Sequence, residues 1–465
     1  MDFFLFCVLI FSVSNAIIIY ISLFSLSFFI RLFIYNTHAP PSLGVENNNL
    51  AVMKITPTDN IFTPIVERYV DMDLHLSSNG ISISFAGNPL LLWNLVGLRS
   101  KDRAEWANVV CSSTEVAEHI LIRGSAWKDP QIIQLASMLP KWTLRNVFDL
   151  GDNELGEKAA NAIAKALPDC QFTTMRLNDN NMSPIAFAAI ADALPSIPTM
   201  IGLYVSGNNI ADAGATAIAH VIPLTKLTSL AVDNNKIGDA GAAAIAGALS
   251  TSNLDRIDLG RNINIGHAGA QAISEALPTS KVTSLGLHRM KNIGNAGISF
   301  LSTALPTSVL DYLDISGTGI TYEGVANLCT ALSTSDLRLL HIEYNNIGDA
   351  EIALLSNALS TSNLTSIYLS KNNITDAGAT VLAKALLKSK LTVLELDFKH
   401  VGDAGAIALA NVIADSKIVK LIFLMYDNNM EAPGIRALAS VFDNKCSKKT
   451  SCLTRDECFQ QIECY

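Results

Sequence analysis

Histidine and cysteine side chains often carry catalysis or bind metals, and this chain has eight of each. The histidines are scattered without the spacing of a metal site, and the cysteines form no CxxC pair. No P-loop, HExxH or GxSxG motif occurs. The segment 317–324, GTGITYEG, is rich in glycine, but its last glycine belongs to a periodic series described below. We therefore expect no catalytic residue, no metal site and no cofactor.

Composition limits the classes of partner. The chain has 465 residues, of which 33 are Lys or Arg and 42 are Asp or Glu, giving a net charge of −9. A net-acidic chain without runs of Lys or Arg is a poor candidate for binding nucleic acid. The hydrophobic fraction of 49% and the charged fraction of 16% exclude a disordered chain and supply ample surface for a core.

The chain repeats itself from about residue 120 onward. The last large apolar residue of each unit recurs every 27 to 29 residues, twelve times in register. These residues are Leu139, Leu167, Leu194, Ile222, Leu249, Leu277, Leu305, Leu332, Leu359, Leu386, Ile413 and Phe442. Because no single unit can bury its apolar face alone, we expect the array to fold as one cooperative solenoid.

Each unit divides into a strand, a turn and a helix. The alternation in Leu230-Ala231-Val232 predicts a short strand with its leucine and valine facing inward. The helical half, such as GAAAIAGAL, has apolar residues three and four positions apart. An asparagine between them can satisfy turn backbone groups that no strand partner reaches. It recurs as Asn153, Asn180, Asn208, Asn235, Asn345 and Asn372.

Stacked units would align these asparagines into a ladder. Thr318 and Lys399 interrupt it, and an extra loop residue in the units of Asn262 and Asn292 predicts a blurred ladder there. A glycine also recurs four positions after the loop hydrophobe, where a small residue would let the start of the helix lie close to its neighbour. It occurs at Gly214, Gly241, Gly269, Gly297, Gly324, Gly378, Gly405 and Gly434, with Ala159, Ala186 and Glu351 as exceptions.

The motif LxxLxLxxNxIGDAGAxAIAxAL, nearly complete at 227–249, resembles the ribonuclease-inhibitor-like subfamily of leucine-rich repeats. That subfamily includes ribonuclease inhibitor, the repeat regions of NOD-like receptors and the GTPase-activating protein for Ran. The resemblance covers roughly residues 120–442. It implies an α/β solenoid, a leucine-rich-repeat horseshoe with parallel strands on the concave face and helices on the convex face. It also implies that the solenoid mainly binds proteins.

The regions outside the repeats have a different composition. LHLSSNGISISF predicts a hairpin with Asn79-Gly80 as a type I′ turn, and RSKDRAEWANVV, residues 99–110, predicts a short helix. We expect five segments: a hydrophobic segment at 1–35, a linker at 36–60, a small N-terminal domain or cap at 61–118, twelve leucine-rich repeats at 119–442, and a cysteine-containing tail at 443–465.

Residues 3–30 form a run without charge, glycine or proline. The run is long enough for a transmembrane helix, and Arg31 after it favours the repeats lying in the cytosol. A small-x-small site at Ser14 and Ala16 allows a cleaved signal peptide instead. The third interpretation is a spurious extension with the true start at Met53, which gives a cytoplasmic protein. The composition leaves all three open.

The tail has four cysteines that are each six residues apart: Cys446, Cys452, Cys458 and Cys464. In an oxidising compartment they could form two disulfides, and in the cytosol they would be thiols. The sequence leaves their redox state open.

The outward strand positions are the surface with most functional information. Their charged residues comprise seven acids and two bases, and three tyrosines accompany them. Tyrosines beside charges are typical of protein-binding hot spots. The charged residues are Asp149, Arg176, Asp233, Arg256, Asp258, Asp314, Glu343, Glu395 and Asp397. With Tyr204, His288, Tyr312, His341 and Tyr368, all but Asp149 and Asp233 form the predicted binding site.

The sequence thus predicts a non-enzymatic scaffold or sensor whose concave face binds a protein partner with a basic patch. Two alternatives stay open. A GTPase-activating protein of the Ran type fits the resemblance, although the expected acidic C-terminal tail is missing. An extracellular recognition receptor would need oxidised tail cysteines.

Overall fold

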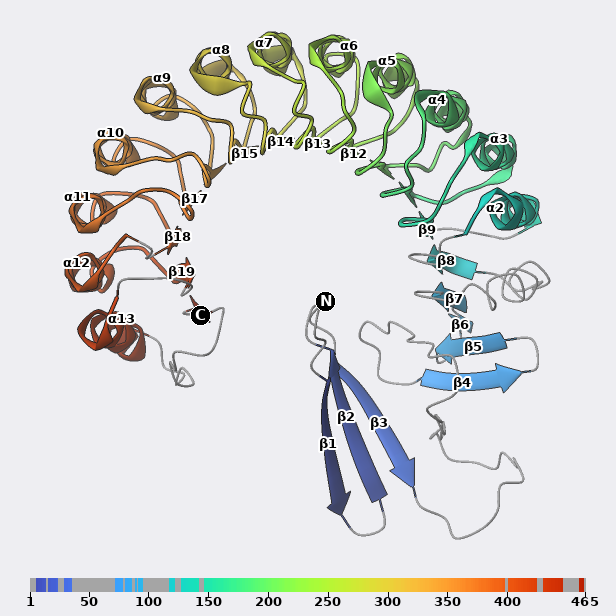
Figure 1. Ribbon diagram of the computed structural model, residues 1–465, viewed down its shortest axis with the longest axis horizontal. Coiled ribbons are helices and arrows are strands. Elements are labelled where there is room, and N and C mark those ends of the chain that lie inside the picture. The colour runs from blue at the N-terminus through green and yellow to red at the C-terminus, as the bar shows by residue number, and fades with distance from the viewer. Residues whose placement is uncertain are drawn as a thin grey trace.

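A computed structural model describes residues 127–141, 146–397, 400–424 and 430–445, together with short strands outside these ranges. The repeats stack into a curved solenoid with the strands on its inner side and the helices on its outer side (Figure 1). The predicted α/β solenoid with parallel concave strands and convex helices is confirmed.

The inner side is one sheet of fourteen strands in the order β20 to β7, each hydrogen-bonded to the next. Strands β7 to β19 pair in parallel, and β20 pairs antiparallel with β19. Their bounds are β7 Leu91–Asn94, β8 Ala117–Leu121, β9 Val147–Asp149, β10 Thr174–Arg176, β11 Gly202–Tyr204, β12 Ser229–Ala231, β13 Arg256–Asp258, β14 Ser284–Gly286, β15 Tyr312–Asp314, β16 Leu339–His341, β17 Ser366–Tyr368, β18 Val393–Asp397, β19 Lys420–Leu424 and β20 Gln460–Glu463. The sheet thus begins before residue 119.

One helix follows each strand of the repeats, and the described part of the chain has twelve of them. Their bounds are α2 Asp129–Ala136, α3 Glu157–Ala166, α4 Pro184–Ala193, α5 Ala211–Val221, α6 Asp239–Leu249, α7 His267–Ala276, α8 Gly294–Ala304, α9 Tyr322–Leu332, α10 Asp349–Leu359, α11 Asp376–Leu386, α12 Asp403–Ile413 and α13 Ala432–Lys445. Each helix packs against the next.

The core lies between the strands and the helices and is continuous along the array. Leu230 and Val232 are buried, while Ala231 between them is partly exposed on the concave side. The expected alternation of the strand is therefore present. The buried apolar residues of each strand, of the residue after it and of each helix give each unit contacts with both neighbours.

The buried asparagines form the ladder at the ends of the strands. The Asn262 carboxamide oxygen accepts the backbone N–H groups of Asn235 at 2.7 Å and Ile237 at 3.1 Å, in the preceding unit. The prediction of a blurred ladder at Asn262 is wrong. The extra residue of that unit, Ile263, follows the ladder position and projects outward with 64% of its surface exposed. In the next unit the buried Met290 occupies the ladder position, and Asn292 is exposed. The ladder therefore lacks a side-chain amide in that unit.

Thr318 continues the ladder by donating its hydroxyl to the Ile315 carbonyl at 2.8 Å. Lys399 lies outside the described residues.

A second ladder joins the helix starts. Asp212 at the start of α5 accepts the backbone N–H groups of Gly238 at 2.6 Å and Gly241 at 3.0 Å, which open α6. A carboxylate at a helix N-terminus satisfies orphan donors and complements the helix dipole. Asp129, Asp239, Asn295, Asp349, Asp376 and Asp403 act in the same way on the helix of the following unit.

This contact gives the recurring glycine a second cause besides helix packing. A Cβ at Gly241 would lie 2.6 Å from the Asp212 carboxylate and 2.9 Å from the Ala215 Cβ. The exception Glu351 also has a reason. Its own side chain accepts the N–H of Gly348 at 2.9 Å, so α10 is capped from within its own unit.

The hydrophobic N-terminal run does not form the expected helix. It contributes three antiparallel strands, β1 Phe6–Val13, β2 Ala16–Leu23 and β3 Phe29–Tyr35. The run is rich in isoleucine and phenylalanine, which favour strands. No helix in the described part of the chain is long and apolar enough to span a membrane. Membrane attachment through residues 3–30 stays a prediction.

The predicted hairpin is present as β4 Met72–Ser77 and β5 Gly80–Phe85, to which β6 Asn88–Pro89 adds a third strand. Its register pairs Ser77 with Gly80, so the connecting residues are 78 and 79 and not the predicted 79 and 80. The helix expected at 99–110 and the four tail cysteines lie outside the described residues.

Candidate functional site

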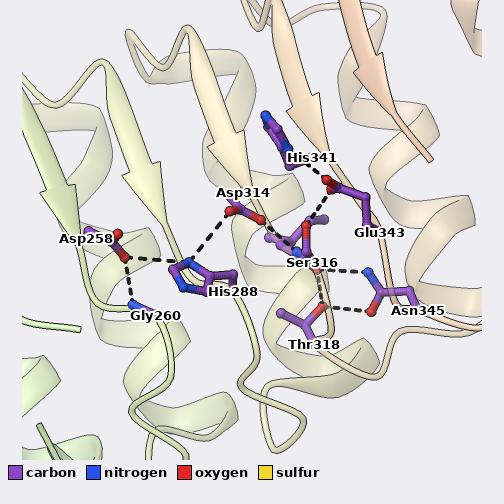
Figure 2. Close-up of polar contacts among 10 residues, drawn as sticks. Asp258, Gly260, His288, Asp314, Ser316, Thr318, His341, Glu343 and Asn345 are labelled. Atoms are coloured by element: carbon purple, nitrogen blue, oxygen red, sulfur yellow. Dashed lines mark hydrogen bonds and ion pairs between the residues drawn. The ribbon is translucent and has the colours of Figure 1, made fainter. Parts of the chain in front are cut away.

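The concave side of strands β13 to β18 gathers most of the predicted site residues. Most of them stand in two parallel rows, at the third strand position and at the second residue after it, and Tyr312 stands at the first strand position of β15. We call this surface the concave floor and define it by Asp258, His288, Tyr312, Asp314, Ser316, His341, Glu343, Tyr368 and Glu395. Figure 2 shows its polar contacts, which cross from one unit to the next.

His288 lies between two carboxylates. Its Nδ1 is 3.7 Å from Asp258 Oδ1 and 3.6 Å from Asp314 Oδ2 (Figure 2). Gly260 makes room for the ring, since a Cβ there would collide with it. Asp258 also accepts the Gly260 N–H at 2.9 Å. Burial raises the pKa of Asp258 although His288 acts in the opposite direction.

His341 and Glu343 form the second charged contact, with Nδ1 3.1 Å from Oε1. Ser316 donates its hydroxyl to the other oxygen of Glu343 at 2.6 Å. Burial lowers the pKa of His341, but the hydrogen bond and charge of Glu343 outweigh it, so that the pKa is raised. Burial likewise raises the pKa of Glu343, but the hydrogen bonds from His341 and Ser316 leave it lowered. Both shifts favour the ionised pair.

Three rings form a platform beside these charges. His341 stacks on Tyr368 with 4.0 Å between ring centroids and 9° between planes, and Tyr312 lies 5.4 Å from His341 at 44°. Burial and the nearby carboxylates raise the pKa of both phenols, which are therefore neutral near pH 7. Burial also raises the pKa of Glu395, at the end of the platform. The result is a cluster of three rings bordered by carboxylates.

Four predicted residues lie apart from this floor or face away from it. Arg176 is on β10, where its guanidinium lies 5.5 Å from the Tyr204 ring and 4.0 Å from Asp149. Arg256 is largely exposed and pairs with its neighbour Asp255 at 3.5 Å. Asp397 is buried and accepts the Lys371 backbone N–H at 2.6 Å, so it braces a loop.

Sequence reasoning missed Ser316, Gly260 and Gly286. Ser316 orients Glu343, and Gly286 leaves space for Asp258, whose Oδ1 would lie 2.6 Å from a Cβ at that glycine. A signal was available. Each of the three stands at an outward position of its unit, so the alternation along the strand and the loop identifies it as facing the concave side.

Within the described ranges, no group of three or more His, Cys, Asp or Glu residues is arranged to hold a metal ion. The floor contains His and carboxylate pairs but no serine, threonine or cysteine nucleophile in contact with a histidine. The floor offers charged groups and rings for contact.

Four segments of the solenoid match a known family of repeats. Residues 198–219, 224–246, 308–329 and 361–383 match the model of the Leucine Rich repeat family. The solenoid consists of leucine-rich repeats. The chain is also similar in fold to a chain in the crystal structure of the Rad7 and Elc1 complex in yeast, with 14% identity and a TM-score of 0.47, covering 73% of this chain and 86% of that chain. No curated protein sequence matches the chain.

Proposed function

We propose that this leucine-rich-repeat protein is a non-enzymatic scaffold or sensor whose concave floor binds a protein partner with a basic patch. The observation that carries the proposal is the ring platform of Tyr312, His341 and Tyr368 set among carboxylates on one face. The motif at 227–249 further supports placing the repeats in the ribonuclease-inhibitor-like subfamily.

The charges of the floor do not cancel. Asp258, Asp314, Glu343 and Glu395 face two histidines, so with its carboxyls ionised the floor keeps a negative charge even when both rings are protonated. Such a surface attracts cationic groups, and complementary charge mainly sets the association rate and the choice of partner. The half-buried tyrosines and His341 supply the apolar contact area that hot spots need.

The test compares proteins retained by the full chain with those retained by a double variant, Asp314→Lys with Glu395→Lys. A matched control reverses two exposed carboxylates on the convex helices, Glu157→Lys with Glu275→Lys. We expect salt-sensitive binding to the native chain and the control, and a loss of about tenfold or more in the floor variant. Unchanged retention and salt dependence in a folded floor variant would place the binding site elsewhere.

A further inference from the structure

A second charged surface runs along the loops that follow strands β12 to β17, next to the concave floor. It consists of the residues directly before and after each position of the asparagine ladder, and we call it the loop rim. Within these six units it carries five cations and neither aspartate nor glutamate. The cations are Lys236, Arg261, Arg289, Lys291 and Lys371.

The fold itself does not require these cations. Lys236, Arg261, Arg289 and Lys371 all have positive φ, between 55° and 60°. Glycine and asparagine adopt this conformation most readily, so the backbone alone would favour those residues here. Four of the five cations are exposed, and none forms an ion pair with a residue that the structure describes.

One rim cation is held in place over a ring. The Arg289 guanidinium lies 5.5 Å from the ring centroid of Tyr344, which is 55% exposed. Gly317 occupies the same position in the unit between them, and a Cβ there would lie 3.4 Å from the Arg289 Cα. An exposed cation–π contact lowers the freedom of the arginine while its N–H groups stay open to solvent.

The sign of charge reverses at the boundary between floor and rim. Arg289 directly follows His288, and Arg261 comes three residues after Asp258. The same units place Asp258, Asp314 and Glu343 on the floor, without a lysine or arginine at those rows. The aspartates at the helix starts lie beyond the rim, and their carboxylates accept backbone N–H groups of the next helix.

We propose that the loop rim binds the acidic side chains of an extended protein segment whose basic side chains lie on the floor. The inference rests on the proposed function and adds the second half of the partner's chemistry. Successive side chains of an extended segment point to opposite sides, so alternating basic and acidic residues match both surfaces. A nucleic acid fits less well, because phosphates over the rim would meet the floor carboxylates.

The experiment uses the full chain and synthetic peptides of about ten residues, which span roughly 33 Å when extended, against roughly 24 Å for six strands. One peptide alternates Lys and Glu, and a second has the same composition in two blocks. We expect the alternating peptide to bind about fivefold tighter by fluorescence anisotropy. The preference should vanish in Arg261→Glu with Arg289→Glu and persist in the control Lys158→Glu with Lys165→Glu on α3.

Should the reversed rim pair reduce thermal stability, Arg261→Gln with Lys371→Gln gives the same readout with a milder change. Equal binding of the two peptides, no binding of either, or a preference that survives in the rim variants would overturn the proposal.

Tighter binding of a single-stranded oligonucleotide, lost in the rim variant, would overturn it in favour of nucleic acid. An all-lysine peptide separates the two proposals, because its binding depends on the floor alone. If Asp314→Lys abolishes its binding and the rim variants retain it, the proposed function is supported even where the proposal for the rim is overturned.

Discussion

The asparagine ladder and the concave floor are both rows of polar side chains that repeat once per unit, yet they do different work. Each ladder amide meets backbone groups of its own unit and of the unit before it, and it is buried. The floor carboxylates Asp258 and Asp314 accept one backbone N–H each but also meet side chains and solvent, and Asp258 keeps 40% of its side-chain surface exposed. A periodic row of polar side chains therefore indicates architecture where the side chains are buried against backbone groups, and recognition where they stay partly exposed beside other side chains.

The largest expected change in the free energy of unfolding comes from comparing a residue on the core side of a strand with one on the floor side. Leu230→Asp places an uncompensated carboxylate in the core and should lower the free energy of unfolding by about 3–5 kcal/mol. Ala231→Asp, one residue along on the concave side, should change it by less than about 1 kcal/mol. Thermal or urea unfolding of both variants measures the difference. Equal effects would mean that the two sides of the strand are not distinct.

The next effect tests the ladder directly. Asn262→Ala leaves the buried N–H groups of Asn235 and Ile237 without an acceptor and should cost at least about 2 kcal/mol, since each orphaned group costs about 1–3. The exposed Asn264→Ala in the same loop should stay within about 0.5 kcal/mol. Chemical unfolding of the two variants measures the difference in their free energies of unfolding. If Asn262→Ala were as stable as the native chain, the distinction between ladder and floor would be lost.

Two glycines of α6 compare a position in close contact with the neighbouring unit and a position with open space around it. Gly241→Ala should destabilise by about 1–3 kcal/mol, because its Cβ meets Asp212 and Ala215. Gly247→Ala should stabilise by about 0.5–1 kcal/mol, because nothing lies within 4 Å and alanine favours helix. Melting temperatures should therefore move in opposite directions. Shifts of the same sign would contradict the close contact at the helix start.

The smallest effect is a pH dependence on the floor. The raised pKa of His341 contributes stability that is present below its unfolded value of 6.5 and lost as pH rises through the folded pKa. The lowered pKa of Glu343 contributes stability present above 4.5 and lost as pH falls through its folded pKa. Urea unfolding of the native chain and His341→Gln should differ most between these values, and a difference that does not vary with pH would refute the ion pair.

The regular spacing of apolar residues made the fold predictable from the sequence. The side-chain contacts between neighbouring units were harder to predict. Twelve apolar positions in register specified the solenoid, and strand alternation placed Tyr312, Asp314 and His341 on one face. The helix expected for the hydrophobic run at 3–30 is wrong, because length and apolarity suit a membrane helix and a strand segment alike. The pairing of His288 with two carboxylates depends on the empty space at Gly260, which only packing reveals.

The two ladders give the array a direction. Each aspartate caps the helix of the unit after it, whereas each ladder asparagine serves the loop of the unit before it. A terminus cut at the N-terminal side of a unit therefore leaves a helix without its carboxylate, and a cut at the C-terminal side leaves loop N–H groups without an amide. During synthesis a new helix finds its cap already in place, while its loop must wait for the next unit to emerge. The two ends of such an array consequently need different chemistry to close them, an acidic group at the first helix and an acceptor amide at the last loop.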